Sequence, residues 1–219
     1  MAATLTTLRD RVEATLQDAA NVRWATSDLD EAIRRALEEF SSACPREVVV
    51  PVTLTADGRE VDLSALTGRL QVTRVWFPYT AADPEHPPRW APFEVWGDTL
   101  YLDTADEPQA GEVARLWHTA PHTLDGLDGA TATTLPADAE GLIVGGAAGQ
   151  AALQRAVELS ESLNVDADVV ERLTIYGRAR LDEFRAGLRA CQRQGAARDS
   201  GVSGAPRLDR WDERDPERW

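Results

Sequence analysis

The chain has 219 residues, of which 43% are hydrophobic, and a formal net charge of −14. This length suits one domain, or one domain with a sizeable insertion, and is long enough to bury a real core. Tight DNA binding draws its affinity from clustered basic residues, so the acidic balance argues against a groove that grips DNA. All 23 residues counted as Lys or Arg are arginines, which excludes a Schiff-base lysine and a phosphate-loop lysine.

The N-terminal residues and the two cysteines indicate in which cellular compartment the protein is made. The charged residues near the N-terminus are unlike a secretory signal, and no stretch approaches the ~20 apolar residues that span a bilayer. We therefore expect a soluble protein made in a cytoplasm. Cys44 and Cys191 fall at the ends of two predicted helices, and we expect both to be small buried hydrophobes rather than a disulfide.

Helical periodicity marks the first part of the chain. Apolar residues at helical spacing predict a helix over Thr4–Ala19 and a second one that ends near Ser42, because Pro45 cannot continue it. We expect Thr26 or Ser27 to cap this second helix. Trp24 lies in the link between the helices, and we expect its ring to cover their core with the indole N–H facing outward.

From Glu47 the pattern changes to short runs of β-branched and aromatic residues separated by turn signals. We predict five or six strands between Val48 and His118. Pro51 indicates an edge position or a bulge in the first strand. The proline-rich interval Tyr79–Pro92 is expected to be a long excursion between two strands.

Helices return after Pro136. Several glycines interrupt the first of them, each costing roughly 1 kcal/mol relative to alanine, and we expect close approach of a neighbouring helix to offset that cost. A last helix is predicted from about Asp166 to Gln192, capped by Asn164 or Asp166. The chain after Gln192 is rich in glycine and charge, and we expect it to be disordered alone.

These elements predict an α+β fold: a four-helix bundle, of two N-terminal and two C-terminal helices, with an inserted antiparallel β subdomain and a flexible C-terminal tail. We expect the helical hairpin at residues 1–46, the β subdomain at 47–122, the second helical pair at 123–192 and an extended docking tail at 193–219. The insertion should leave and re-enter the bundle at nearby points.

No pattern of residues points to catalysis, a metal or a cofactor. The segment GLIVGGAAGQ lacks both the dinucleotide fingerprint and GK[ST], and we interpret it as a close-packed helix. His118 and His122 are separated by Pro121, so hydrogen bonds to the backbone are a better interpretation than a metal site. The segment DGLDG, residues 125–129, reads as a turn rather than a calcium loop. We therefore expect no enzyme activity, no metal and no cofactor.

The C-terminal tail interleaves arginines and acids with tryptophans. Tryptophan and arginine most often anchor interfaces, and a partner pocket would remove the cost of exposing a terminal tryptophan, so we favour a docking peptide over a solvated tail. The residues expected to dock are Arg207, Leu208, Arg210, Trp211, Arg214 and Trp219.

The order of these segments resembles a known family. A short first helix, then WATSDLDEAIRRALEEF, a β block ending in LWHTAPHTLDG, a TLP step into AEGLIVGGAAGQAALQ and a final long helix are similar to the head-to-tail connector, or adaptor, proteins of tailed bacteriophages. The resemblance covers about Leu5 to Gln192 in order and texture. It implies a virion protein of the neck, assembled in the host cytoplasm, without a membrane anchor.

The resemblance also implies partners. Such proteins form a homo-oligomeric ring, commonly of twelve subunits, beneath the portal protein, and offer a surface to the tail or a stopper protein. A terminal tail reaches into the portal, and DNA passes through the ring without specific binding. The acidic charge fits such a conduit, and we expect part of one acidic set to line the channel or a seam between subunits: Asp28, Asp30, Glu31, Glu38 and Glu39.

Two alternatives remain at this stage. A tail terminator or stopper in the same neck has the same sequence features. A small hydrolase or carbohydrate-binding protein would place its site on the β insertion, with Trp90, Trp96 and Trp117 as stacking platforms and nearby acids for proton transfer.

Overall fold

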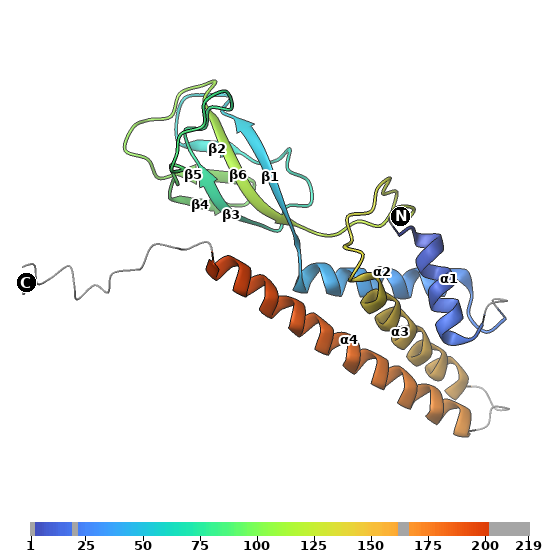
Figure 1. Ribbon diagram of the computed structural model, residues 1–219. Helices are drawn as coiled ribbons and strands as arrows, with labels where there is room; N and C mark the ends of the chain where they lie inside the picture. Colours follow the sequence, from blue (N-terminus) through green and yellow to red (C-terminus); the bar gives the residue numbers. More distant parts are fainter. Residues whose placement is uncertain (1–2, 19–21, 162–166, 202–219) are drawn as a thin grey trace, which may run out of the picture.

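The computed structural model describes residues 3–18, 22–161 and 167–201. These residues form four helices and two three-stranded antiparallel sheets, with the sheets inserted between the second and third helices (Figure 1). The predicted α+β fold, with two N-terminal and two C-terminal helices around an inserted β subdomain, is confirmed.

The N-terminal pair comprises α1 (Leu5–Leu16) and α2 (Thr26–Ala43). The Thr4 hydroxyl accepts a hydrogen bond from the Thr7 backbone N–H and so caps α1. The expected side-chain cap of α2 is wrong. This helix begins at Thr26, with Ala25 at the cap position and no side-chain bond there, so Thr26 and Ser27 belong to its first turn.

Asp18 and Trp24 hold the described residues on either side of positions 19–21, between α1 and α2. The Asp18 carboxylate accepts hydrogen bonds from the backbone N–H groups of Val22, Arg23 and Trp24, at 2.8–3.2 Å. Trp24 is buried in the helical core, but its indole N–H donates inward to the Ala151 carbonyl of the third helix at 3.1 Å. The expectation of an outward N–H is therefore wrong, because a distant backbone carbonyl supplies its partner.

The β subdomain begins directly after α2. One sheet has the order β1 (Arg46–Thr53), β6 (Val113–Ala120), β3 (Gln71–Trp76), and the other has β2 (Glu60–Asp62), β5 (Thr99–Leu102), β4 (Phe93–Trp96). Strand β1 lies at an edge, as Pro51 predicted. The interval between Trp76 and Phe93 is the expected long excursion.

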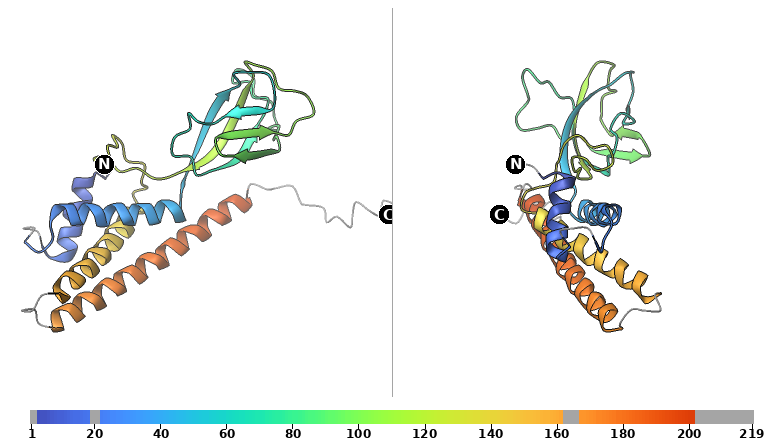
Figure 2. Two further views of the ribbon diagram at one scale, coloured as in Figure 1. Left: turned by 180° about the vertical axis from the view of Figure 1, so that it is seen from behind. Right: turned by 90° about the vertical axis from the view of Figure 1, so that its right-hand side faces the viewer.

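The two ends of the insertion meet. Strands β1 and β6 pair along their whole length, with Arg46 opposite Ala120, so the chain leaves the helices and returns to them at neighbouring points. Alternate residues of β6 are buried in or beside a β core that is separate from the helical core. The subdomain therefore joins the helical unit through the adjoining ends of β1 and β6 and projects away from it (Figure 2).

The C-terminal pair comprises α3 (Glu140–Ser160) and α4 (Ala167–Gly201), which pack side by side. Glycines permit their close approach, as the sequence predicted. A Cβ on Gly149 would lie 3.0 Å from the Gly177 carbonyl oxygen, and one on Gly146 would lie 2.9 Å from the Phe184 ring. The GLIVGGAAGQ segment is thus part of a close-packed helix, in which α3 contacts the other three helices.

Two expectations about the C-terminal part are wrong. Residues 193–201 continue α4 instead of starting an extended tail, since the run QRQGAAR contains mostly good helix formers. Cys44 and Cys191 form a disulfide, with their Cα atoms 6.3 Å apart, because α4 carries Cys191 back to the C-terminal end of α2. The expected caps Asn164 and Asp166 and the chain after Gly201 lie outside the described residues.

Among the described helices, none combines the length and the apolar character needed to cross a membrane. The longest of them, α4, carries charged side chains along its exposed side.

Candidate functional site

The predicted functional residues fall into two groups, and the structure describes only one of them. The tail residues Arg207, Leu208, Arg210, Trp211, Arg214 and Trp219 lie outside the described residues, and their docking role stays a prediction. The acidic set Asp28, Asp30, Glu31, Glu38 and Glu39 lies on α2, where the surroundings of the side chains differ from one acid to the next.

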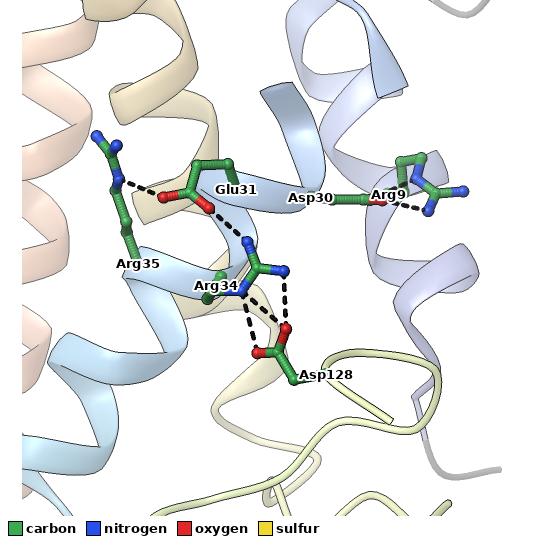
Figure 3. Close-up of polar contacts among 6 residues, drawn as sticks. All are labelled: Arg9, Asp30, Glu31, Arg34, Arg35 and Asp128. Atoms are coloured by element: carbon green, nitrogen blue, oxygen red, sulfur yellow. Dashed lines mark hydrogen bonds and ion pairs between the residues drawn. The ribbon is translucent and has the colours of Figure 1, made fainter. Parts of the chain in front are cut away.

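Asp30 is occupied by an arginine of its own subunit. Arg9 of α1 donates from Nε to Oδ1 at 2.8 Å and from Nη2 to Oδ2 at 2.9 Å, and both side chains are largely covered (Figure 3). Two parallel bonds of this kind fix the geometry of the pair as well as its energy. Asp30 therefore holds α1 against α2 and offers little charge to a partner.

Glu31 belongs to a network of alternating charge. It accepts hydrogen bonds from Arg35 at 3.0 Å and from Arg34, while Arg34 also grips Asp128 of the loop that follows β6 (Figure 3). Arg35 and Arg34 hold the pKa of Glu31 below its ordinary value, and Arg34 does the same for Asp128. Arg34 thus anchors the turn at residues 125–129 to α2, while Glu31 and Arg35 remain partly open to solvent.

The other three acids are less engaged. Asp28 lies in the first turn of α2, where negative charge complements the helix dipole. Glu39 is exposed and accepts a hydrogen bond from Gln150 of α3 at 3.1 Å. Glu38 is exposed and has no ion-pair or hydrogen-bond partner in the described part of the chain. Of the predicted set, Glu38 is the acid most available to another molecule.

A groove that sequence reasoning missed lies beside Glu38. It has a volume of about 510 Å³ and runs between α2, the start of β3 and the turn after β6. Its wall includes Leu70, which is 56% exposed, together with Pro45 and Pro121. Leu70 could have been noticed in the sequence as an apolar residue just before β3. The groove itself could not be predicted, because it forms only where three separate segments of the chain meet.

His122 closes one side of this groove, and its contacts are to backbone. The Nδ1 atom lies 2.9 Å from the Thr134 carbonyl oxygen, and Nε2 lies 3.0 Å from the Cys44 carbonyl oxygen. His118 is buried in β6 with Nδ1 3.3 Å from the Thr119 carbonyl oxygen. The predicted backbone hydrogen bonds of both histidines are confirmed. No group of three or more potential metal-ligating side chains occurs among the described residues.

The three tryptophans considered as a stacking platform do not form one. Trp90 and Trp117 are in edge-to-face contact, with ring centroids 5.2 Å apart, but Trp96 lies in the other sheet and is 73% exposed. The hollow of about 320 Å³ on the side of β6 that bears Arg115 has no carboxylate in its wall. A hydrolase would need a proton donor or a nucleophile beside these rings.

The carboxylate pKa shifts also fail to indicate a general acid. Although burial opposes ionisation, hydrogen bonds and ion pairs hold the pKa of four described carboxylates below the ordinary value: Asp18, Glu31, Asp62 and Asp128. A catalytic acid that works near neutral pH needs a raised pKa, as burial without a cationic partner produces. These acids are instead suited to stay ionised in hydrogen bonds and ion pairs.

Solved chains that are similar to this one include two from the necks of GTA particles. No family model and no curated protein matches the sequence. A chain from the neck of a native GTA particle, computed with C12 symmetry, is 17% identical, covers 78% of this chain and 88% of its own, and has a TM-score of 0.29. A chain from the neck of an empty GTA particle, computed with C6 symmetry, is 16% identical, covers 79% and 92%, and has a TM-score of 0.28. TM-scores of this size do not establish a shared fold.

Proposed function

We propose that this chain is a structural protein of a virion neck. In finer terms, it is a head-to-tail adaptor that forms a ring below the portal, extends the DNA channel and offers an attachment surface to the tail. The observation that carries the proposal is the architecture. Two helical pairs share one core, and a β subdomain leaves them and returns through the paired strands β1 and β6. This order of segments resembles that of the phage connectors.

Exposed apolar side chains support a role in assembly. Val157 lies in the last turn of α3 and Ile175 about two turns into α4, and each side chain is more than 60% exposed. The C-terminal end of α3 and the N-terminal end of α4 lie away from the β subdomain (Figure 2). Val95, Trp96 and Tyr101 are exposed on β4 and β5. A head-to-tail ring needs two different surfaces on each subunit, and a neck protein also needs surfaces above and below the ring. Apolar residues at two distant places fit that requirement.

The charge supports a conduit rather than a DNA-binding protein. The net charge of −14 repels phosphate, so DNA can pass a ring of such subunits without being held. The exposed acids of α2, Glu38 above all, suit a position along the channel or a seam.

The proposal is tested by mixing the purified chain with its cognate portal protein and imaging the product by electron microscopy. We expect a ring of this chain, coaxial with the portal, and no enzymatic turnover. A chain that stays apart from the portal under all conditions would overturn the adaptor role. A ring found only at the tail end of the neck would indicate the terminator or stopper role instead.

The tail is tested separately with a chain that ends at Gly201. This variant keeps every described element, so its circular dichroism and melting temperature should match those of the full chain. We expect it to lose portal docking, because it lacks Trp211 and Trp219. Unchanged docking would remove the tail from the mechanism while leaving the adaptor role in place.

A further inference from the structure

Two helices of the protein carry matching rows of charge on their exposed sides. On α2, Glu31, Arg35 and Glu38 follow one another at intervals of four and three residues, which places them on one face of the helix. We call these the α2 triplet, and its charges run minus, plus, minus. Arg35 and Glu38 are exposed, and Glu31 is 40% exposed at its side chain.

The second row lies on α4. Arg178, Asp182 and Arg185 have the same intervals of four and three residues, and their charges run plus, minus, plus. We call these the α4 triplet. All three side chains are exposed, and the only contact among them is a loose one of 3.9 Å between Arg185 and Asp182. Arg178 has no ion pair or hydrogen bond to any residue that the structure describes.

The triplets cannot meet within one subunit, because they point away from each other. Arg35 precedes Cys44 by nine residues, and Asp182 precedes Cys191 by nine. Nine residues are two and a half helical turns, so each triplet is centred on the side of its helix opposite the disulfide that joins α2 to α4. The α2 triplet and the α4 triplet therefore lie on opposite flanks of the helical unit.

From this geometry we propose that the α4 triplet of one copy binds the α2 triplet of the next copy and forms the seam of the ring. The inference rests on the proposed function, which supplies the ring, and it names the surface that closes it. Three complementary contacts result: Arg178 with Glu31, Asp182 with Arg35, and Arg185 with Glu38. Opposite flanks that bind each other are the arrangement of a heterologous interface, which repeats around a closed ring.

The register of these contacts agrees with a ring that has no rise along its axis. Within the subunit, α2 and α4 run in the same general direction (Figure 1), and the Cys44–Cys191 bond sets residues 147 apart at the same level. The pairs Glu31–Arg178, Arg35–Asp182 and Glu38–Arg185 are also 147 apart. The two helices are inclined to each other, and a ring axis along their mean direction moves a neighbour sideways without changing its level (Figure 1). The same offset is then the one that a closed ring requires.

The competing arrangement is an antiparallel contact between the α2 triplet and the α4 triplet, and it pairs different residues. It also sets Arg35 against Asp182, but it brings Glu31 to Arg185 and moves Arg178 next to Glu38 and Glu39. Because α2 and α4 run in one direction within the subunit, such a contact turns each neighbour upside down, so successive copies alternate in direction and do not form a ring in which all copies face one way. The partner of Glu38 therefore distinguishes the two arrangements.

Charge-exchange variants of the full chain test the seam. Glu38→Arg places a positive charge opposite Arg185, so one exposed ion pair is lost and a repulsion takes its place. We therefore expect the association constant of each interface to fall roughly tenfold at low salt. Glu38→Arg with Arg185→Glu should restore association. Glu38→Arg with Arg178→Glu is the matched control and should not. These side chains are exposed, so folding should be unaffected; association is measured by sedimentation velocity, alone and on the portal.

The outcomes separate the seam from the adaptor role. Rescue by Arg178→Glu instead of Arg185→Glu would replace the parallel ring seam with an antiparallel contact and overturn the proposal. Rings that form on the portal and ignore all three variants would overturn the seam alone. A chain that never associates, even on the portal, would remove both. Retention of single-stranded DNA by the wild-type chain, lost on Arg185→Glu, would assign the α4 triplet to nucleic acid and overturn the seam.

Discussion

Replacement of Gly149 by alanine tests how closely α3 and α4 pack. The new Cβ would lie 3.0 Å from the Gly177 carbonyl oxygen and 3.0 Å from the Arg180 Cβ. Backbone atoms cannot swing aside as the end of a flexible side chain can, so the two helices must move apart by a few tenths of an ångström. Overpacking of this kind costs about 1–3 kcal/mol. Alanine gains about 1 kcal/mol over glycine in a helix interior, which leaves a net loss of roughly 0–2 kcal/mol.

Gly145→Ala is the matched control. It lies four residues earlier in the same helix, and a Cβ there would meet nothing within 4 Å. The propensity gain is then unopposed, and we expect Gly145→Ala to stabilise the protein by up to about 1 kcal/mol. The two variants should differ by about 2 kcal/mol in free energy of unfolding, or about 4–8 °C in melting temperature for a chain of this length.

The assay is urea unfolding followed by circular dichroism, with the slope of free energy against urea concentration checked for two-state behaviour. Gly149→Ala combined with Gly177→Ala should cost less than the sum of the single losses, because both substitutions open the same gap. If Gly149→Ala stabilised the protein as much as Gly145→Ala, the close approach of α3 and α4 would be refuted.

Three further predictions concern the ties between the helices. Although burial acts against ionisation, hydrogen bonds from three backbone N–H groups hold the pKa of Asp18 below its ordinary value of 3.8. Its contribution to stability should be complete above about pH 5 and lost as the pH falls through the folded-state pKa, so Asp18→Asn should flatten the acid limb of a stability-versus-pH curve; an unchanged limb would contradict this. Trp24→Phe should cost about 1–3 kcal/mol in urea unfolding, because it removes the bond to the Ala151 carbonyl and leaves space in the core; an unchanged midpoint would contradict this. Cys191→Ser should cost up to about 5 kcal/mol, since the Cys44–Cys191 bond closes a long loop, and dithiothreitol should then lower the melting temperature of the wild-type chain but not of the variant.

Local patterns in the sequence were enough to predict the elements and their order. Period-3.6 apolar residues marked the four helices, and β-branched runs with turn residues marked the strands. The glycines of α3 indicated close packing because their helix cost had to be offset. Contacts between residues that are far apart in the sequence could not be predicted from such local patterns. The partner of the Trp24 indole is a carbonyl 127 residues away, and the disulfide depends on how far α4 extends along α2.

In the candidate site, too, contacts within one helix could be predicted from the sequence and contacts between elements could not. The ion pair of Glu31 with Arg35 can be predicted from their i, i+4 spacing, whereas that of Asp30 with Arg9 joins two helices and needs the fold. The sequence marked five acids of α2 as equivalent, but the structure engages Asp30 fully and leaves Glu38 unpaired among the described residues. Net charge alone could not separate them, because only the fold shows that Arg9 covers both carboxylate oxygens of Asp30.

The α4 triplet shows how the fold gives a charge pattern a possible partner that the sequence alone does not indicate. In the sequence, Arg178, Asp182 and Arg185 are ordinary residues of a solvated helix face, and nothing relates them to α2. The disulfide fixes the level of α4 against α2 and leaves the two charged faces on opposite flanks. Exposed ion pairs are worth little one at a time, so a single subunit contact of this kind would be weak and salt-sensitive. In the proposed ring the same contact would recur at every subunit, so binding to a portal would decide where and when such weak contacts assemble.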